Sequence, residues 1–268
     1  MMLAIPPLVA EPIFHIGNFP VTNAYINSSL AVLFFVVIGF LLRNKTDLRP
    51  KGLQNFFEGV LEFMLSYVDQ VTHNRKKSLQ FLPIVGGIFL FILFSNWLGL
   101  LPGTGSFGRY LSVHGERELV PFLRSANSDL NLTLAMAVFA VIGSHIIGVM
   151  TIGFFRYANK FIKLGDIIKS FSKGSISIMV AFIEFGVGLI EIISEVAKII
   201  SLSLRLFGNI FAGEVLLTVL AGLIAYFVPL PFMLLELIVG LIQALVFSML
   251  TLVYLTMATA ELPQEAHH

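Results

Sequence analysis

The sequence predicts an all-α polytopic membrane protein, with about five membrane helices and one amphipathic helix on the inner membrane surface. Of its 268 residues, 57% are hydrophobic and only 12% are charged, whereas a soluble domain carries roughly a quarter charged residues. The mean hydropathy is +0.90. So few charged residues cannot cover the surface of a soluble globular domain, and much of the apolar surface must therefore face lipid.

Charge and residue usage exclude several classes of function. The formal net charge is +1, so no global field favours nucleic acid, and we expect no nucleic-acid partner. The absence of cysteine excludes disulfides, thiolate metal sites and a cysteine nucleophile. The hydrolase and phosphate-binding motifs H-E-x-x-H, G-x-S-x-G and G-x-x-x-x-G-K-S/T are absent. We therefore expect no metal site, no cofactor and no bond chemistry in this chain.

Long uncharged stretches mark the membrane spans, since a spanning helix needs about 20 mostly apolar residues. The five candidate spans are residues 25–42, 79–101, 130–155, 175–227 and 228–260. The fourth stretch is much too long for one upright span. Pro229 and Pro231 indicate a tight turn between the last two helices.

Two segments outside these spans have their own pattern. Residues 1–24 contain four prolines and lack the basic start of a secretory signal, which predicts a retained, irregular leader. Within the loop 43–78, apolar residues recur at helical spacing over residues 51–72. This pattern is typical of an amphipathic helix lying on the membrane surface. A helix that packs against a partner is an equally open interpretation.

The basic residues predict the orientation. Lys and Arg are concentrated in the segments 43–78 and 156–174, while the segment 102–129 has only three, which are offset by acids. Because positive loops stay on the inner side, the first two segments are expected inside and the third outside. The leader is then outside, and the tail 261–268 is inside after five crossings.

Seven charged residues lie in apolar surroundings where lipid would penalise them. They are Glu184, Glu191, Glu195, Lys198, Arg205, Glu214 and Glu236. A charge at the middle of a bilayer costs at least about 2.5–3.5 kcal/mol on insertion scales. These groups must therefore pair with one another or line a water-filled path, and an ion pathway is the default hypothesis.

The spacing of these charges places most of them on one stripe. Glu184, Glu191, Lys198 and Arg205 are each seven residues apart, and seven residues return to within about 20° on a helix. Ser194, Ser201 and Asn209 lie beside this stripe. Glu195 can pair with Lys198 at i+3, whereas Glu214, nine residues after Arg205, faces about 180° away. Alternatively, the stripe up to Lys198 is a solvated face where the helix emerges inside.

Other polar residues are weaker candidates. Glu236 and Gln243 share a face of the last helix and could meet Arg205 and Glu214 across a helix pair. His145, in the third span, is interpreted as an interhelical hydrogen-bond donor, with a proton relay as the alternative. Asn96 and Asp129 are possible accessory residues.

A resemblance to a known family supports this interpretation. Residues 201–214 read S-L-S-L-R-L-F-G-N-I-F-A-G-E, which resembles the signature of subunit a of the membrane sector of bacterial-type F-type ATP synthases. Segments that resemble other parts of this family follow in the same order: residues 9–17, 94–102, 128–135 and 242–255. The resemblance thus covers nearly the whole chain.

The resemblance implies a stator subunit whose last two helices form a long, strongly tilted hairpin against a rotor ring. Two aqueous half-channels reach this ring, and the essential Arg205 separates them. By position, Glu214 and Glu236 belong to the outer half-channel, and Gln243 and Asn209 lie near the arginine. Ser201, Lys198 and Glu191 border the inner half-channel. Many family members have one acid and one histidine where this chain has Glu214 and Glu236.

The resemblance also implies partners and a location. The partners are a ring of c subunits, the peripheral-stalk b subunits, the remainder of the ATP synthase and the lipid bilayer. The expected function is proton transport that is coupled to ATP synthesis at a bacterial plasma membrane. The alternative is a stand-alone secondary ion transporter or channel, which is typically built from repeats. We find no repeat in the sequence.

Overall fold

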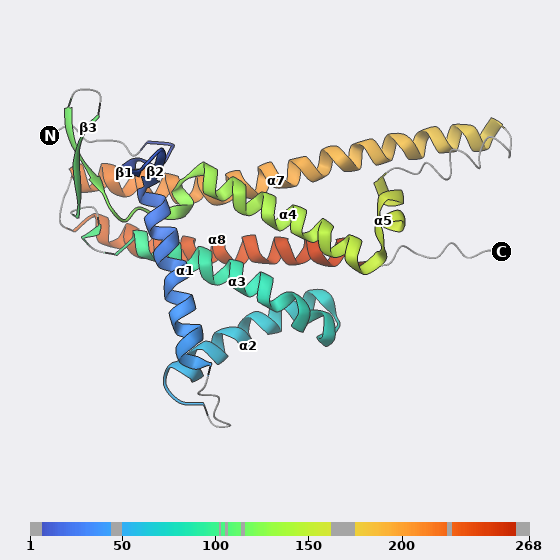
Figure 1. Cartoon of the computed structure of the whole chain (residues 1–268), viewed down its shortest axis with the longest axis horizontal. Helices are drawn as coiled ribbons and strands as arrows, with labels where there is room; N and C mark the ends of the chain where they lie inside the picture. Colours follow the sequence, from blue (N-terminus) through green and yellow to red (C-terminus); the bar gives the residue numbers. More distant parts are fainter. Residues whose placement is uncertain are drawn as a thin grey trace.

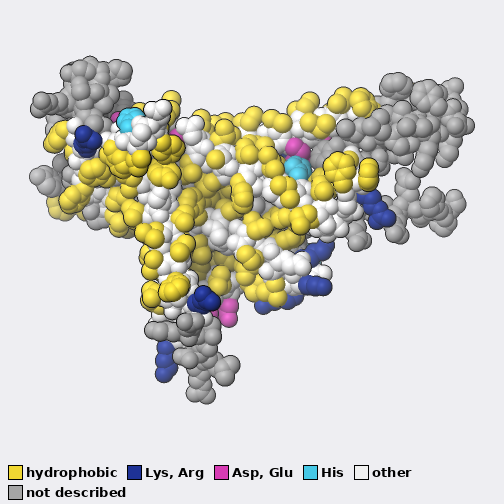
Figure 2. Space-filling model, viewed as in Figure 1, with side chains coloured by type: hydrophobic (Ala, Val, Ile, Leu, Met, Phe, Trp, Pro, Cys, Tyr) yellow, Lys and Arg dark blue, Asp and Glu magenta, His cyan; other side chains and the backbone are white. Residues whose placement is uncertain are grey.

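The computed structural model describes residues 7–43, 50–101, 103–104, 107–113, 116–161, 175–223 and 227–260. Within these ranges the chain is mostly helical, and five helices are long and apolar enough to cross a membrane (Figure 1). Hydrophobic side chains cover much of the described surface on the face shown in Figure 2. The prediction of an all-α polytopic membrane protein is therefore confirmed.

The prolines predicted an irregular leader, but the described part of the leader contains a β-hairpin. Strand β1 (Pro12–Ile16) pairs with the antiparallel strand β2 (Phe19–Thr22). Gly17, with a φ of +62°, and Asn18 form the two-residue turn between them, a loop that suits a hairpin. Prolines are tolerated because Pro12 is the first residue of its strand and Pro20 lies in a two-stranded sheet with open edges.

Helix α1 (Asn23–Leu42) begins directly after this hairpin, two residues before the predicted start. The hydroxyl of Thr22 accepts a hydrogen bond from the backbone N–H of Tyr25 and so caps the helix. Only Asn23, Ala24, Asn27 and Ala31 are buried, all in the first half of α1. The remaining apolar surface is thus available to lipid.

Helix α2 (Leu53–Thr72) matches the predicted amphipathic helix to within two residues. Met64, Leu65 and Val68 are buried, whereas Leu53 and Phe56 are each 63% exposed. The C-terminal half of the apolar stripe therefore packs on the protein itself. The N-terminal half remains open to a membrane surface.

Helix α3 (Arg75–Gly99) begins four residues before the predicted start at residue 79 and ends two residues early. The side chain of Asn74 accepts hydrogen bonds from the backbone N–H groups of Lys76 and Lys77. Because this cap starts the helix at Arg75, the basic residues form its first turn. The outer segment 102–129 is also more ordered than a loop. It contains the antiparallel strands β3 (Gly108–Val113) and β4 (Glu116–Pro121) and the short helix η2 (Ala126–Ser128).

Helix α4 (Leu130–Ile152) ends three residues before the predicted boundary at 155. Gly153 has a φ of +95°, a conformation that glycine adopts easily and that ends the helix. Helix α5 (Phe154–Phe161) follows at an angle and occupies the start of the predicted inside loop. Residues 162–174 of that loop lie outside the described ranges.

The last two helices are the longest. Helix α7 (Ser175–Leu223) has 49 residues and helix α8 (Pro229–Ala258) has 30. Helix α8 ends two residues before its predicted boundary, while residues 224–226 and the predicted tail 261–268 lie outside the described ranges. At about 1.5 Å per residue α7 is about 74 Å long, far more than the roughly 30 Å of a bilayer core. The two helices run alongside each other and cross α1 steeply (Figure 1).

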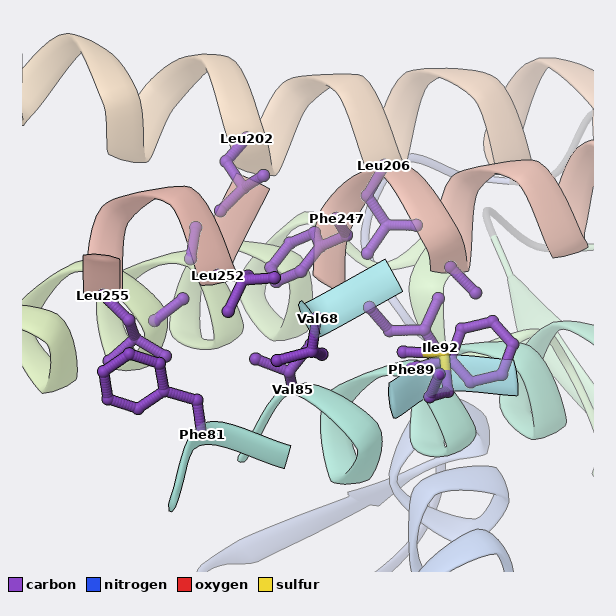
Figure 3. Packing of buried hydrophobic residues seen from close by; sticks show 14 of the residues in the cluster. Val68, Phe81, Val85, Phe89, Ile92, Leu202, Leu206, Phe247, Leu252 and Leu255 are labelled. Carbon is purple, nitrogen blue, oxygen red and sulfur yellow. The ribbon is translucent and has the colours of Figure 1, made fainter. Parts of the chain in front are cut away.

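The buried core forms where α2, α3, α4, α7 and α8 meet (Figure 3). Val68, Val85, Ile92 and Phe247 lie at its centre and are at most 2% exposed. Helix α7 contributes Leu202, Leu206 and Ile210 to this cluster. Since these three recur every four residues, they bury one face of α7 and leave the opposite face outward.

Candidate functional site

The outward face of α7 contains the arginine. Ser201, Arg205 and Asn209 recur every four residues and are all exposed, so they share one face. Arg205 has no hydrogen bond or ion pair with any described residue. Ile200 and Leu204, which point about 140° and about 100° away from Arg205 around the helix, are each 50% exposed. The site is thus a single cation on a short polar stripe of an apolar helix, which the described residues leave uncovered.

On one side of Arg205 lies a cavity of about 540 Å³, which we name the outer cavity. It is bounded by the leader, the end of α3, strand β4 with the segment after it, the C-terminal part of α7 and the start of α8. Its charged or titratable lining residues are Glu11, Arg124, Glu214 and Glu236. The cavity therefore gathers three acids and one permanent cation.

Arg124 and Glu214 form an ion pair in the outer cavity. The Nε group of Arg124 donates to both carboxylate oxygens of Glu214, at 2.8 and 3.1 Å. Its Nη2 group donates to the carbonyl of Pro7 at 2.8 Å. The side chain of Arg124 is only 3% exposed and that of Glu214 is 24% exposed. Glu214 thus faces this cavity and not Arg205, as its spacing predicted.

Glu236 enters the same cavity from α8. It is 8% exposed, and its Oε1 atom is buried with no hydrogen-bond partner in the described part of the chain. Its carboxyl group lies against Gly213, one residue before Glu214, where an added Cβ atom would overlap it. The two acids therefore approach one cavity from facing helices, in agreement with the expected meeting of α7 and α8.

A buried amide network closes the outer cavity toward α3. Asn96 donates to the carbonyl of Gly240 at 3.3 Å and accepts from Asn127 at 2.8 Å and from Ser125 at 3.3 Å. Asp129 instead accepts from the backbone N–H of Asn131 at 3.1 Å and caps α4. Of the two accessory candidates, Asn96 lines the cavity, while Asp129 has a capping role.

A second cavity, of about 360 Å³, lies on the other side of Arg205 between α4, α5, α7 and the end of α8; we name it the inner cavity. Glu195 accepts from Lys198 at 2.6 Å, which confirms the predicted i+3 pair. Its other oxygen lies 3.3 Å from Nε2 of His145. The ammonium of Lys198 also lies 5.2 Å from the ring centre of Tyr254, within the range of a cation–π contact.

His145 joins three helices at the inner cavity. Its Nδ1 atom is 2.6 Å from the hydroxyl of Tyr157 on α5, and Nε2 faces Glu195 on α7. Burial, and then the negative charges of Glu195 and Glu191, raise the pKa of Tyr157 to about 12. The interhelical hydrogen bond that the sequence suggested for His145 is therefore present.

The remaining predicted site residues have clear positions with one exception. Glu191 and Ser194 line the inner cavity. Gln243 is buried on α8 at 9% exposure, and no described hydrogen bond links it to Arg205. The side chain of Glu184 lies outside what the structure describes. Among the described residues, no three His, Asp or Glu side chains come close enough to hold a metal ion.

Two site residues were missed from the sequence. The sequence indicates Arg124 only as one of the three arginines of the segment 102–129, and it gives no signal for Tyr157. The short apolar run at residues 119–123, directly before Arg124, is a local signal that could have indicated its burial. Tyr157 follows the helix-ending Gly153 by four residues, but nothing local indicates that α5 folds back toward α7.

Along α7 the order of these features is simple. Residues between 187 and 198 line the inner cavity, Arg205 follows, and residues between 210 and 221 line the outer cavity. With a rise of about 1.5 Å per residue, Arg205 lies roughly 10 Å from Lys198 and roughly 14 Å from Glu214 along the axis. Along α7, the exposed cation thus lies between two cavities, each of which contains charged side chains.

Comparison with known proteins agrees with this arrangement. Residues 25–256 match the family model described as ATP synthase A chain. The subunit a of ATP synthase from Mycobacterium bovis is 34% identical over 252 residues, which cover 92% of this chain and 90% of the relative. The same subunit from Moorella thermoacetica is 30% identical over 243 residues, with 91% and 93% covered. The chain therefore belongs to the ATP synthase subunit a family.

Proposed function

We propose that this chain is the stator subunit that carries protons to and from a rotating ring of c subunits, and so couples proton flow to ATP synthesis. As a family member it is a multi-pass membrane protein and a part of an ATP synthase complex. The observation that carries the proposal is the position of Arg205. It is exposed, unpaired among the described residues, and lies along α7 between two cavities that each contain charged side chains. This arrangement supports two half-channels that do not join.

The chemistry of arginine suits the separating position. A guanidinium has a pKa above about 12 and keeps its proton in a protein. It can therefore attract an ionised carboxylate on a passing ring subunit without conducting a proton itself. That carboxylate enters lipid only after it has taken up a proton, because the charged form is costly there. Each proton must then travel nearly a full turn of the ring.

The cavities supply the two ends of this route. In the proposed cycle, the proton arrives through the outer cavity, which Glu214 and Glu236 line, and the inner cavity with Glu191 and Lys198 receives it after the turn. Ser201 and Asn209 lie on the ring-facing surface with Arg205, and Gln243 of α8 is proposed to lie near the arginine. No covalent bond is made in this chain, since the ATP chemistry belongs to other subunits.

The position of the basic residues supports an orientation. Helix α3 begins with Arg75, Lys76 and Lys77, and α5 contains Arg156. The start of α3 and α5 lie toward one end of the molecule, and the two β-hairpins lie at the other end (Figure 1). By the positive-inside rule the inner cavity faces the cytoplasm of a bacterial cell and the leader lies outside. The exposed flank of α1 is the proposed contact for the peripheral-stalk b subunits.

Substitution of the arginine tests the proposal. We expect Arg205→Ala to lower ATP-driven proton pumping and ATP synthesis at least tenfold in membranes with the assembled complex. Ile193→Ala, at another exposed position of α7, should retain both activities. Normal coupled synthesis in the Arg205→Ala membranes would refute the role. Purification tests the alternative of a stand-alone transporter, because a stator subunit copurifies with the ring and the soluble ATPase.

A further inference from the structure

Arg124 gives the two acids of the outer cavity different surroundings. Glu214 is held by a guanidinium that donates to both of its oxygens. Glu236 has no such partner, and one of its oxygens has no hydrogen bond within the described residues. Two carboxyl groups that line the same cavity are therefore not equivalent, although the sequence alone does not distinguish them.

The anchoring of Arg124 makes this difference permanent. Its side chain is 3% exposed, and Nη2 is tied to the carbonyl of Pro7. A guanidinium cannot give up its proton, and a buried cation needs an anion close by. Glu214 supplies that anion. If Glu214 took up a proton in each cycle, the buried cation would lose its counter-ion each time.

We propose that Arg124 is a positioning residue that holds Glu214 as its ionised partner, so that Glu236 alone takes up and releases the transported proton in the outer cavity. This division of labour rests on the proposed function. It assigns a role to an arginine of the outer segment that is distinct from the separating role of Arg205. Glu214 then serves to neutralise Arg124 and to keep the cavity polar.

The other charged groups around the cavity are consistent with this assignment. The described lining residues of α3 and β4 are uncharged, and the leader contributes Glu11, which has an interaction of its own. Glu236 meets Gly213 of α7, where the absence of a side chain lets its carboxyl group pack against the backbone of α7. Of the two acids, Glu236 is thus the one that lies against the backbone of the other helix.

Charge-matched pairs of substitutions test the proposal in the assembled enzyme. The rate of ATP synthesis is measured in proteoliposomes at a fixed potassium diffusion potential, while the pH on the outer side of the subunit is varied. Glu236→Gln should lower the rate at least a hundredfold. Glu214→Gln should lower it at least tenfold, because this substitution leaves Arg124 without its anion. The double variant Arg124→Gln/Glu214→Gln should then recover at least fivefold over Glu214→Gln. The double variant Arg124→Gln/Glu236→Gln should be no faster than Glu236→Gln.

The pH profile separates positioning from simple structural support. The measured quantity is the outer pH at which the rate of ATP synthesis is half-maximal. Arg124→Gln should move this midpoint to higher pH, because removal of a cation makes ionisation of the cavity acids less favourable. Arg124→Lys should keep the wild-type midpoint. Arg109→Gln is the matched control, since Arg109 of the same outer segment donates to the carbonyl of Ile13 at 3.1 Å and has no ion pair with a described carboxylate.

Two results would overturn the division of labour. One is a double variant that assembles and is no faster than Glu214→Gln, which would mean that Glu214 transfers the proton itself. The other is an Arg124→Gln profile with an unchanged midpoint, a measurement that does not depend on the double variant. If Arg205→Ala and Glu236→Gln both keep wild-type rates, it is the proposed function that fails instead.

Discussion

The carboxyl group of Glu236 lies against the Cα atom of Gly213, so that a methyl group on residue 213 would overlap it. This contact joins α7 and α8 at the outer cavity. It also explains a glycine within a long membrane helix, where alanine has the better helix propensity by about 1 kcal/mol. The close approach of a side chain from α8 offsets that preference.

Gly213→Ala should therefore impair proton transport. The added methyl group displaces Glu236, and forced overpacking costs typically about 1–3 kcal/mol. We expect ATP-driven pumping to fall at least fivefold in assembled enzyme. Gly186→Ala is the control, because no atom of the described residues lies within 4 Å of an added Cβ atom there. Equal pumping by the two variants would show that Glu236 has room to move aside.

His145→Ala should destabilise the inner end of the protein but leave proton transport largely intact. His145 contacts Tyr157 on α5 and Glu195 on α7, and loss of a buried hydrogen-bond partner costs about 1–3 kcal/mol. Thermal unfolding in detergent measures this loss, with Ile146→Ala, at a 55% exposed position, as the control. A large loss of pumping without a loss of stability would favour the proton-relay alternative.

Tyr157 should make the protein sensitive to alkaline pH. Its pKa is raised from 10.0 to about 12 by burial and nearby acids, so the folded state holds the proton more tightly than the unfolded state. This contribution to stability is complete below pH 10 and is lost as the pH rises toward 12. We expect wild-type protein to lose stability more steeply than Tyr157→Phe across this interval, as followed by thermal unfolding at several pH values.

A matched variant shows whether this effect belongs to Tyr157. Tyr25, on α1, is 52% exposed. Tyr25→Phe should therefore follow the wild-type curve. A wild-type slope in Tyr157→Phe as well would assign the alkaline loss to other groups.

Met64→Ala should loosen α2 from the core. Met64 is fully buried against the cluster that α2 shares with α3, α7 and α8, and truncation of a buried methionine costs about 2–5 kcal/mol. Phe56→Ala, at the exposed end of the same helix, should change the free energy of unfolding by less than about 0.5 kcal/mol. Chemical unfolding in detergent compares the two. Similar losses would mean that α2 docks along its whole length.

Much of the fold follows from local patterns. The five spans were predicted because uncharged stretches of sufficient length have few alternatives to a membrane helix. The boundaries were wrong by two to four residues where a cap or a glycine decides the end, as at Asn74 and Gly153. The two hairpins were missed because each is short and interrupted by residues that usually indicate loops, such as the prolines at 12 and 20.

In the candidate site, relations within one helix could be predicted from the sequence, whereas contacts between distant segments could not. Helical periodicity predicted that Arg205 and Glu214 face different directions, and that Lys198 pairs with Glu195, because both relations lie within one helix. The pairing of Arg124 with Glu214, ninety residues apart, has no local signal. It depends on how the outer segment folds over the end of α7.

The sequence by itself determined that this is a membrane protein, which segments cross the membrane and which charged residues would be unfavourable in contact with lipid. The reason is that a charge within a long apolar stretch enters the membrane together with that stretch, where lipid penalises it. Only the tertiary structure decided which charges meet, because Arg124, Glu214 and Glu236 reach the outer cavity from three separate elements. It likewise decided that Arg205 is left uncovered, since the burial of Leu202 and Leu206 in the core turns the arginine outward.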